Sequence, residues 1–288
     1  QRIWIATFEG GINYLKKEAN EKSVQFINYR NRLKNYPITQ CYRTRFITSD
    51  VKGNIWIGSA TGLLMCEGNF NEPEKITFHR YSRIPGNPQS LSNNDIHNIF
   101  FTQKGEMYVA TFGGGLNKLL SLNKEQATFK AYTMKNGLPS DVLLSIEEDK
   151  DGNLWCATEE ELCKFIPTTE KIINYPSRVF PRRISFNEGA ALRAHSDHLM
   201  FNTVKGILCF FPDSIHTSTY IPPIIFTRLQ QAEKTVTPGE GSILSTHIDD
   251  TRLLTLPHDK NTFSIQFAAL DMKYPNNISY SYQLEGFE

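Results

Sequence analysis

Short runs of apolar and aromatic residues recur along the chain and alternate with turns rich in Gly, Asn and Asp. Such runs, bounded by turn residues, predict β-strands, and no stretch carries the period of an amphipathic helix. Five of them share one pattern, in which an aliphatic residue and an aromatic residue or Met stand shortly before Thr or Ser. These copies are residues 3–7, 55–59, 107–111, 154–158 and 199–203.

The copies return at a nearly constant interval. The residues in their second position lie 52, 52, 47 and 45 positions apart, and they are Trp4, Trp56, Tyr108, Trp155 and Met200. Such a period is typical of propellers and solenoids. Turns and further strands follow in the same order within each unit, which is the pattern of antiparallel hairpins. We therefore predict an all-β chain of about five four-stranded antiparallel propeller blades.

The first unit starts directly at its Trp strand, without the inner strand that residues 142–147 supply ahead of Trp155. Propellers close with roughly four to eight blades, and closure removes free sheet edges. We expect residues 1–221 to be blades of a larger ring, of about seven, with the first blade truncated.

The pattern changes after the fifth unit. Pro222 and Pro223 stiffen a connection. Beyond them, alternating apolar positions at residues 253–256, 263–267 and 280–284 predict half-buried strands. Residues 222–288 are therefore expected to form a second, smaller β domain.

The turn after each repeated pattern indicates how the next hairpin is built. Gly62, Gly115 and Gly206 occupy a position where a positive φ is expected, and glycine adopts that conformation without strain. The fourth unit has Glu161 there. Its turn must be built differently.

Composition narrows the function classes. The formal net charge is +1, which gives no general electrostatic case for binding nucleic acid or a membrane surface. No apolar run is long enough to span a bilayer, and no signal peptide is visible at Gln1. The five cysteines lack CxxC spacing, so we expect buried free thiols, with Cys156 and Cys163 able to touch across one hairpin. No metal and no cofactor is predicted.

The five repeats resemble the two-component regulator propeller repeat. Residues 261–271 and 280–287 look like the triple-tyrosine domain that follows such propellers. Residues 186–191, 206–207 and 211–215 are similar to the family's last blade. The resemblance covers essentially the whole chain.

The resemblance implies the periplasmic sensor region of a membrane-bound hybrid two-component regulator of the kind found in gut Bacteroidetes, which responds to oligosaccharides released from polysaccharides. In that family two propellers precede an immunoglobulin-like sandwich, a transmembrane helix, a histidine kinase, a receiver and a DNA-binding domain. It therefore implies that residues 222–288 begin a triple-tyrosine sandwich, that the protein forms a homodimer, and that its parent is anchored in the inner membrane and regulates transcription. This segment is expected to be no enzyme and to make no direct nucleic-acid contact.

Loops that lead into the inner strands of a propeller approach its central funnel, and here they are residues 40–45, 92–97, 137–142 and 182–188. Their polar side chains can bind hydroxyl, sulfate or carboxylate groups, and tyrosines can stack on a sugar ring. Alternatively, Asn, Ser and Asp in these loops hydrogen-bond their own backbone. The candidate ligand-binding residues are Tyr36, Tyr42, Arg43, Arg45, Asn93, Asn94, Asp95, His97, Asp141, Arg182 and Arg183.

The densest basic stretch suggests either an acidic saccharide or simply a solvated face. It consists of Arg30, Arg32, Lys34, Arg43 and Arg45.

Catalytic interpretations have less support. His195 and His198 have an H-x-x-H spacing but occupy a turn position, and Gly113, Gly114 and Gly115 precede a strand rather than a helix. No pair of acids identifies a glycosidase. Three function classes stay open: a ligand-sensing ectodomain, a propeller scaffold for protein partners, and a glycan lyase or hydrolase.

Overall fold

The computed structural model describes residues 2–16, 25–176, 179–180, 184–189, 191–215, 222–258, 261–271, 278 and 280–286. The chain divides into two compact units, Gln1–His216 and Thr217–Glu288.

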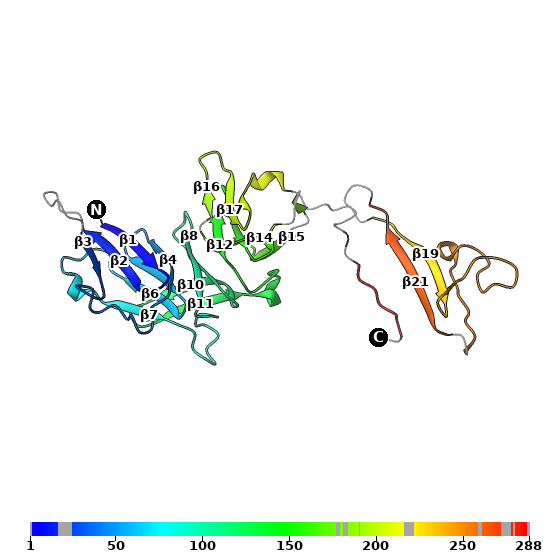
Figure 1. Cartoon of the computed structure of the whole chain (residues 1–288), viewed down its shortest axis with the longest axis horizontal. Helices are drawn as coiled ribbons and strands as arrows, with labels where there is room; N and C mark the ends of the chain where they lie inside the picture. Colours follow the sequence, from blue (N-terminus) through cyan, green and yellow to red (C-terminus); the bar gives the residue numbers. More distant parts are fainter. Residues whose placement is uncertain are drawn as a thin grey trace. The chain divides into compact units, whose positions relative to one another are not determined.

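The described residues of the first unit form five antiparallel sheets that follow one another in chain order (Figure 1). The first sheet has the strands β1 (Arg2–Thr7), β2 (Gly11–Lys16) and β3 (Gln25–Asn28). The second has β4 (Thr44–Ser49), β5 (Ile55–Ser59), β6 (Gly62–Cys66) and β7 (Phe78–Tyr81). The third has β8 (Ile96–Phe101), β9 (Met107–Thr111), β10 (Gly115–Leu122) and β11 (Ala127–Tyr132).

The fourth sheet has β12 (Ser145–Glu148), β13 (Leu154–Ala157), β14 (Glu161–Ile166) and β15 (Lys171–Pro176). The fifth has β16 (Leu192–Arg193), β17 (Leu199–Thr203) and β18 (Gly206–Phe210). The predicted all-β fold with four-stranded antiparallel blades is confirmed. Within the described residues the first and fifth blades have three strands each.

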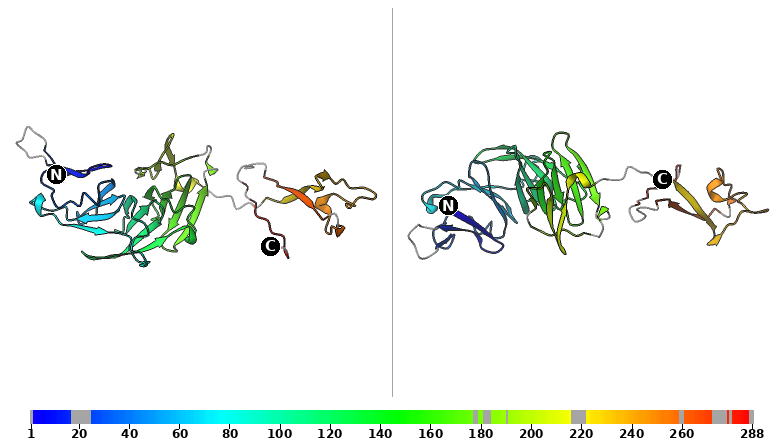
Figure 2. Two further views of the ribbon diagram at one scale, coloured as in Figure 1. Left: turned by 60° about the horizontal axis from the view of Figure 1, so that its bottom comes forward. Right: turned by 90° about the horizontal axis from the view of Figure 1, so that it is seen from above.

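Neighbouring blades pack face against face (Figure 2). Side chains alternate between the two faces of a strand, so Trp56 contacts the third blade while Ile55 and Ile57 contact the first. Each of the four large core clusters in this unit lies between two consecutive blades. The inner strands β4, β8, β12 and β16 lie beside one another in that order, which places their starting ends together.

A carboxylate closes the turn ahead of two of the Trp strands. The Asp50 carboxylate accepts hydrogen bonds from the backbone N–H groups of Lys52 and Asn54, from the Asn54 amide at 2.8 Å and from Trp56 Nε1 at 3.1 Å. Asp149 repeats this arrangement, with Trp155 Nε1 at 3.0 Å. The third blade has Thr102 and Tyr108 in these positions, so the Asp and the Trp are replaced together.

The hairpin that follows each repeated pattern is held by one side chain. The hydroxyls of Thr7, Ser59, Thr111, Thr158 and Thr203 each donate to a carbonyl across the hairpin, at 2.8–3.0 Å. Gly62, Gly115 and Gly206 have φ values of 145°, 71° and 135°, as predicted. In the fourth blade the Thr158 hydroxyl also accepts the Glu161 N–H at 3.0 Å, which closes that turn without glycine.

The cysteine prediction is largely confirmed. All five cysteines are free, and Cys41, Cys66, Cys156 and Cys163 are buried. Cys156 and Cys163 lie directly opposite each other on β13 and β14. Cys209 is exposed, contrary to expectation, because it lies on the face of β18 that points away from the core between the fourth and fifth blades.

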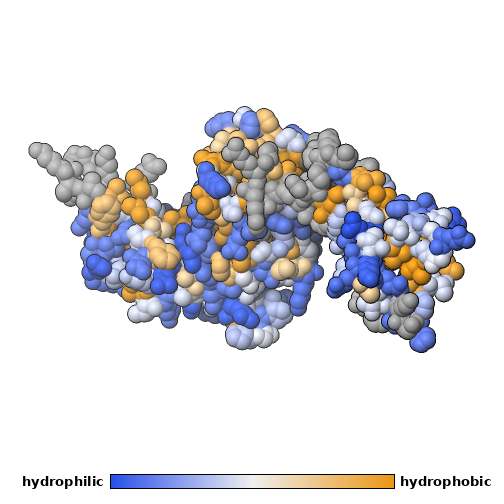
Figure 3. All heavy atoms as spheres, turned by 45° about the vertical axis from the view of Figure 1, so that its right-hand side comes forward, coloured by the Kyte–Doolittle hydropathy of each residue, from blue (hydrophilic) through white to orange (hydrophobic). Residues whose placement is uncertain are grey.

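Where the second unit is described, it contains one three-stranded sheet, in the order β20 (Lys234–Thr235), β19 (Ile224–Gln231) and β21 (Phe263–Ala269). Its small core is built on Leu229, Leu244 and Ile248. Hydrophobic residues also reach the surface of this unit (Figure 3).

Short 3₁₀ turns occur in both units. They are Pro73–Lys75, Met134–Asn136 and Pro212–Ser214 in the first unit and Ile248–Asp250 in the second.

Two predicted strands in the second unit are wrong. Residues 253–256 and the described residues 280–284 are not strands, whereas 263–267 lies within β21. The exposed fractions of Leu253 and Tyr282 are 83% and 82%, so these alternating apolar side chains have no sheet face to pack against among the described residues. The boundary at residue 222 and the triple-tyrosine sandwich stay predictions.

We expect Asp50→Ala to lower the free energy of unfolding by about 1–3 kcal/mol at pH 7, because its hydrogen bonds are lost. Burial tends to raise the pKa of Asp50, but hydrogen bonds from Trp56, Asn54 and Lys52 outweigh it and lower the pKa below its ordinary 3.8. The stabilisation is therefore present above that value and is lost as pH falls through the folded pKa. Urea unfolding at pH 7 and pH 3 measures this.

The control is Asp151→Ala, which removes an exposed carboxylate from the corresponding turn of the fourth blade. It should change stability little at either pH. An Asp50→Ala penalty that is equal at pH 7 and pH 3 would contradict the role given to the ionised carboxylate.

Candidate functional site

The predicted loops meet the second hairpins of the blades at one end of the inner strands. The carbonyl of Asp95 accepts the N–H of Phe112 at 2.9 Å, and the carbonyl of Asp141 accepts the N–H of Gly113 at 3.0 Å. The carbonyl of Tyr42 likewise accepts the N–H of Gly10 at 3.1 Å. The bonds of Asp141 and Tyr42 therefore join consecutive blades where these loops enter the inner strands, while the bond of Asp95 ties the start of β8 to the hairpin of its own blade.

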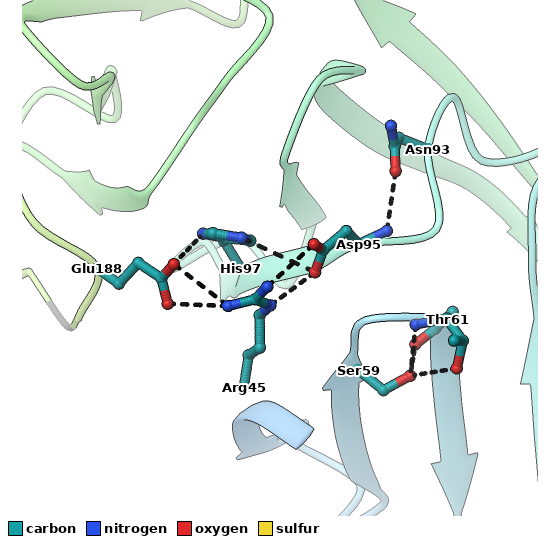
Figure 4. Close-up of polar contacts among 8 residues, drawn as sticks. Arg45, Ser59, Thr61, Asn93, Asp95, His97 and Glu188 are labelled. Carbon is teal, nitrogen blue, oxygen red and sulfur yellow. Dashed lines mark hydrogen bonds and ion pairs between the residues drawn. The ribbon is translucent and has the colours of Figure 1, made fainter. Parts of the chain in front are cut away.

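Arg45 joins three blades at this end of the unit (Figure 4). From β4 of the second blade its Nε and Nη2 donate to the two Asp95 carboxylate oxygens at 2.6 and 3.0 Å. Its Nη1 donates to the Glu188 carboxylate at 3.0 and 3.2 Å. Asp95 precedes β8 of the third blade, and Glu188 precedes β16 of the fifth. One guanidinium thus links groups that are 50 and 143 positions away in sequence.

His97 lies buried beside this cluster, with a side-chain exposed fraction of 1%. Its Nε2 is 3.8 Å from an Asp95 oxygen and its Nδ1 is 3.8 Å from a Glu188 oxygen. Neither ring nitrogen has a hydrogen-bond partner. Burial lowers the pKa of His97, the Arg45 charge lowers it further, and the two carboxylates oppose both effects. The imidazole is therefore neutral at neutral pH and has one donor and one acceptor available.

Two phenyl rings flank the charged groups. Phe112 stacks on His97 with the ring centroids 5.1 Å apart and an angle of 23° between the planes, and 43% of the residue is exposed. Phe8, 52% exposed, lies 5.5 Å from the guanidinium carbon of Arg45 and 5.6 Å from that of Arg43. Because His97 backs one face of Phe112, this ring is held in place while much of it faces solvent.

The Arg45 guanidinium stays charged. Burial opposes its charge, but the hydrogen bonds and charges of Asp95 and Glu188 raise its pKa above the ordinary value. The Arg45 side chain is 17% exposed, Asp95 is 25% exposed and Glu188 is 53% exposed. The interaction with Asp95 is therefore largely sheltered, while the Glu188 carboxylate reaches solvent.

The structure brings only some of the predicted residues together. Arg45, Asp95 and His97 form the cluster, and exposed Arg43 and Tyr42 lie next to it along the same loop. Tyr36 is a wrong choice for sugar stacking, because it is 3% exposed, its hydroxyl donates to the Cys41 carbonyl at 2.7 Å and its ring meets Phe78 edge-on.

Three predicted residues support their own loops, as the alternative interpretation held. Asn93 accepts the Asp95 N–H at 2.9 Å, Asn94 accepts the Arg83 N–H at 2.6 Å, and Asp141 accepts the Met134 N–H at 2.7 Å. Arg182 and Arg183 lie outside the described residues.

The basic stretch does not form one patch around Arg45. Arg32 pairs with Glu74 at 2.6 Å, Lys34 donates to the Arg30 carbonyl, and Arg30 donates to the Tyr29 hydroxyl. These contacts hold the loop that follows β3.

Sequence reasoning missed three residues of the cluster. Glu188 ends the predicted binding loop at residues 182–188, in which the sequence favours Arg182 and Arg183. Phe8 and Phe112 occupy the same place in two repeats, directly after Thr7 and Thr111. Comparing the repeats at that place, where the other blades have Ala60, Glu159 and Val204, could have identified them.

The metal-binding and phosphate-binding motifs considered in the sequence are turns in the described structure. Among the described residues no group of three or more His, Cys, Asp or Glu side chains could hold a metal ion. His195 lies in a turn, and the His198 ring lies against that of Phe211, with the ring centroids 3.6 Å apart and the planes tilted by 35°. Gly115 pairs with Thr111 in the hairpin of β9 and β10, so the glycine run is a turn between strands, as predicted.

Residues 137–160, which contain the third loop and the turn of Asp149, match the family model of the two component regulator propeller. This stretch carries a two-component regulator propeller repeat. This confirms the resemblance seen in the repeats.

A curated relative, histidine kinase P4 of Formosa agariphila, is 26% identical over 288 residues. The match covers 99% of this chain but only 20% of that protein, so the chain spans about a fifth of its relative.

Two solved structures are similar to this chain. The extracellular domain of a hybrid two component system from B. thetaiotaomicron matches with a TM-score of 0.48 and 22% identity, over 92% of this chain and 39% of that one. YCF48 from Cyanidioschyzon merolae matches with a TM-score of 0.50 and 16% identity, over 74% and 66%. In the described part of the chain, no helix has the length and apolar character needed to cross a membrane.

We expect Arg45 and Asp95 to be coupled more strongly than an exposed pair of the same kind. A double-mutant cycle of Arg45→Ala and Asp95→Ala, measured by urea unfolding, should give a coupling of about 1.5–3 kcal/mol. Arg32 and Glu74, whose side chains are 39% and 44% exposed, serve as the control pair. Their cycle should give about 0–1 kcal/mol. Equal couplings would show that the sheltering of Arg45 has no energetic effect.

Proposed function

We propose that this chain belongs to the extracytoplasmic sensing region of a membrane-bound two-component regulator, located in the periplasm, and that it binds a polysaccharide-derived oligosaccharide where Arg45, Asp95, His97, Glu188 and Phe112 meet. The regulator propeller repeats and the histidine kinase relative support a sensing role. The geometry of the site is the observation that supports an oligosaccharide as the ligand.

The cluster has the groups that sugar recognition requires. Sugar rings present hydroxyls around their edges and C–H groups on their faces, so they need hydrogen-bonding groups beside an apolar surface. Glu188 is a half-exposed acceptor, and Phe112 is a partly exposed ring fixed from behind by His97. The buried nitrogens of His97 supply a further donor and acceptor without partners.

Ligand binding here can alter how the blades are held together. Arg45 is bonded to both Asp95 and Glu188, so a ligand that engages Glu188 changes a link between the second and fifth blades. A signal requires different ligand affinities in two conformations of the protein. In our proposal the change passes through the domain that begins near residue 222 to the kinase of a homodimer anchored in the inner membrane.

The test is calorimetry and thermal shift of the full-length protein that carries this chain, against neutral and acidic plant and host oligosaccharides. Saturable binding with stabilisation and unchanged saccharide supports the proposal. Turnover of a glycan would instead indicate a lyase or hydrolase. Binding of a protein partner with no response to any glycan would indicate a scaffold.

We expect Phe112→Ala to weaken oligosaccharide binding about tenfold, because the variant loses the apolar area that the ring would bury against the sugar, and a loss of about 1.4 kcal/mol raises the dissociation constant tenfold. Calorimetry measures the dissociation constant. Phe263→Ala in the second unit is the matched control, since Phe263 is 41% exposed and Phe112 is 43% exposed. Equal affinity of the Phe112 variant and the unmodified protein would remove Phe112 from the site.

A further inference from the structure

The charged groups of the site do not favour an anionic ligand. Arg45 contributes one positive charge, Asp95 and Glu188 contribute one negative charge each, and His97 is neutral. The cluster therefore carries an excess of one negative charge, although it contains the arginine that first suggested an acidic saccharide. In the described part of the chain, Asp95 and Glu188 pair with Arg45, whereas the exposed Arg43 guanidinium packs against Phe8, with its carbon 5.6 Å from the ring centroid.

Most donors of Arg45 are already in use. Nε, Nη1 and Nη2 each donate to a carboxylate oxygen at 2.6–3.2 Å, in four hydrogen bonds that occupy at most four of the five guanidinium N–H groups. A sulfate or carboxylate of a ligand that paired with two of these N–H groups would have to displace Asp95 or Glu188 from the guanidinium. The displaced carboxylate would then lie close to a second anion, and like charges at such distances repel each other strongly where water is partly excluded.

The unused groups instead match hydroxyls. Glu188 is 53% exposed and carries lone pairs beyond those used by Arg45. His97, 1% exposed, lies between Asp95 and Glu188 with both ring nitrogens unpartnered (Figure 4). A hydroxyl can donate to a carboxylate and also accept from or donate to an imidazole nitrogen, whereas an anion can only accept.

We infer that the site takes an uncharged saccharide, with Glu188 accepting its hydroxyls and Phe112 packing against its ring. This inference rests on the proposed function and names the charge class of its ligand. Glu188 is the specificity-determining residue because its carboxylate repels an anionic ligand.

The experiment uses calorimetry with the full-length protein and a panel of neutral oligosaccharides from glucans, mannans, xylans and fructans, with oligogalacturonides, alginate oligomers and heparin fragments as acidic members. The best neutral ligand is then compared with its C6-carboxylated derivative. Carboxylation should weaken binding at least about tenfold, as expected for like charges in a partly sheltered site.

Glu188→Gln keeps the size of the side chain and removes its charge. This variant should bind the carboxylated derivative about tenfold more tightly, so that the dissociation constants of the carboxylated and neutral ligands become more similar. Glu125→Gln, at an exposed residue of the turn between β10 and β11, is the matched control and should leave the ratio unchanged. Urea unfolding checks that both variants are folded.

The outcomes separate the two proposals. Neutral ligands that bind, with discrimination that depends on Glu188, support both. Acidic oligosaccharides that bind more tightly overturn the charge class and leave the sensing proposal intact. The charge class is also overturned if carboxylation weakens binding equally in the unmodified protein and in Glu188→Gln, because the lost affinity then does not come from the charge of Glu188. No binding by any saccharide overturns the proposed function and the inference with it.

Discussion

Mutual burial between blades is the constraint on which the rest of the first unit depends. A single antiparallel sheet of three or four short strands has two faces and little core of its own. Here the second, third and fourth sheets bury one face against the blade before and the other against the blade after, while the first and fifth sheets each pack against one described neighbour; Tyr14, Trp56, Tyr108 and Trp155 are among the residues buried in this way. Side-chain alternation along each strand makes this possible, since adjacent residues serve opposite neighbours.

This packing leaves the loops at the ends of the strands available for binding. The faces of the sheets are committed to core, so polar chemistry collects in the loops where the inner strands begin. The backbone bonds between these loops and the second hairpins fix their position, and side chains such as Asp95 and Phe112 are thereby held beside one another. A rigid scaffold with variable loops is the usual division between stability and binding.

The repeating part of the fold could be predicted from the sequence because the same strand and turn positions recur in several units, whereas a single short apolar run does not identify a strand. Five aligned Trp-type positions identified the strands, and Gly62, Gly115 and Gly206 identified the hairpins. The second unit gave no such repetition, and residues 253–256 and 280–284 show that alternation alone does not make a strand without a partner.

The site was partly predictable for a related reason. Loop position pointed to Arg45, Asp95 and His97, but residue type alone could not distinguish Tyr36 in the core from Phe112 at the surface. Nor could it show that Glu188 meets Arg45, since that contact depends on how the two intervening blades are arranged.

The separation of 143 residues between Arg45 and Glu188 also orders events in time. Closing so long a segment of unfolded chain costs entropy that is recovered only once the intervening sheets have packed. The link between these two residues is therefore a late product of folding, and a chain emerging from the ribosome has blades before it has a complete cluster. In our proposal, recognition at this end of the strands therefore requires the packed fold and not the separate loops.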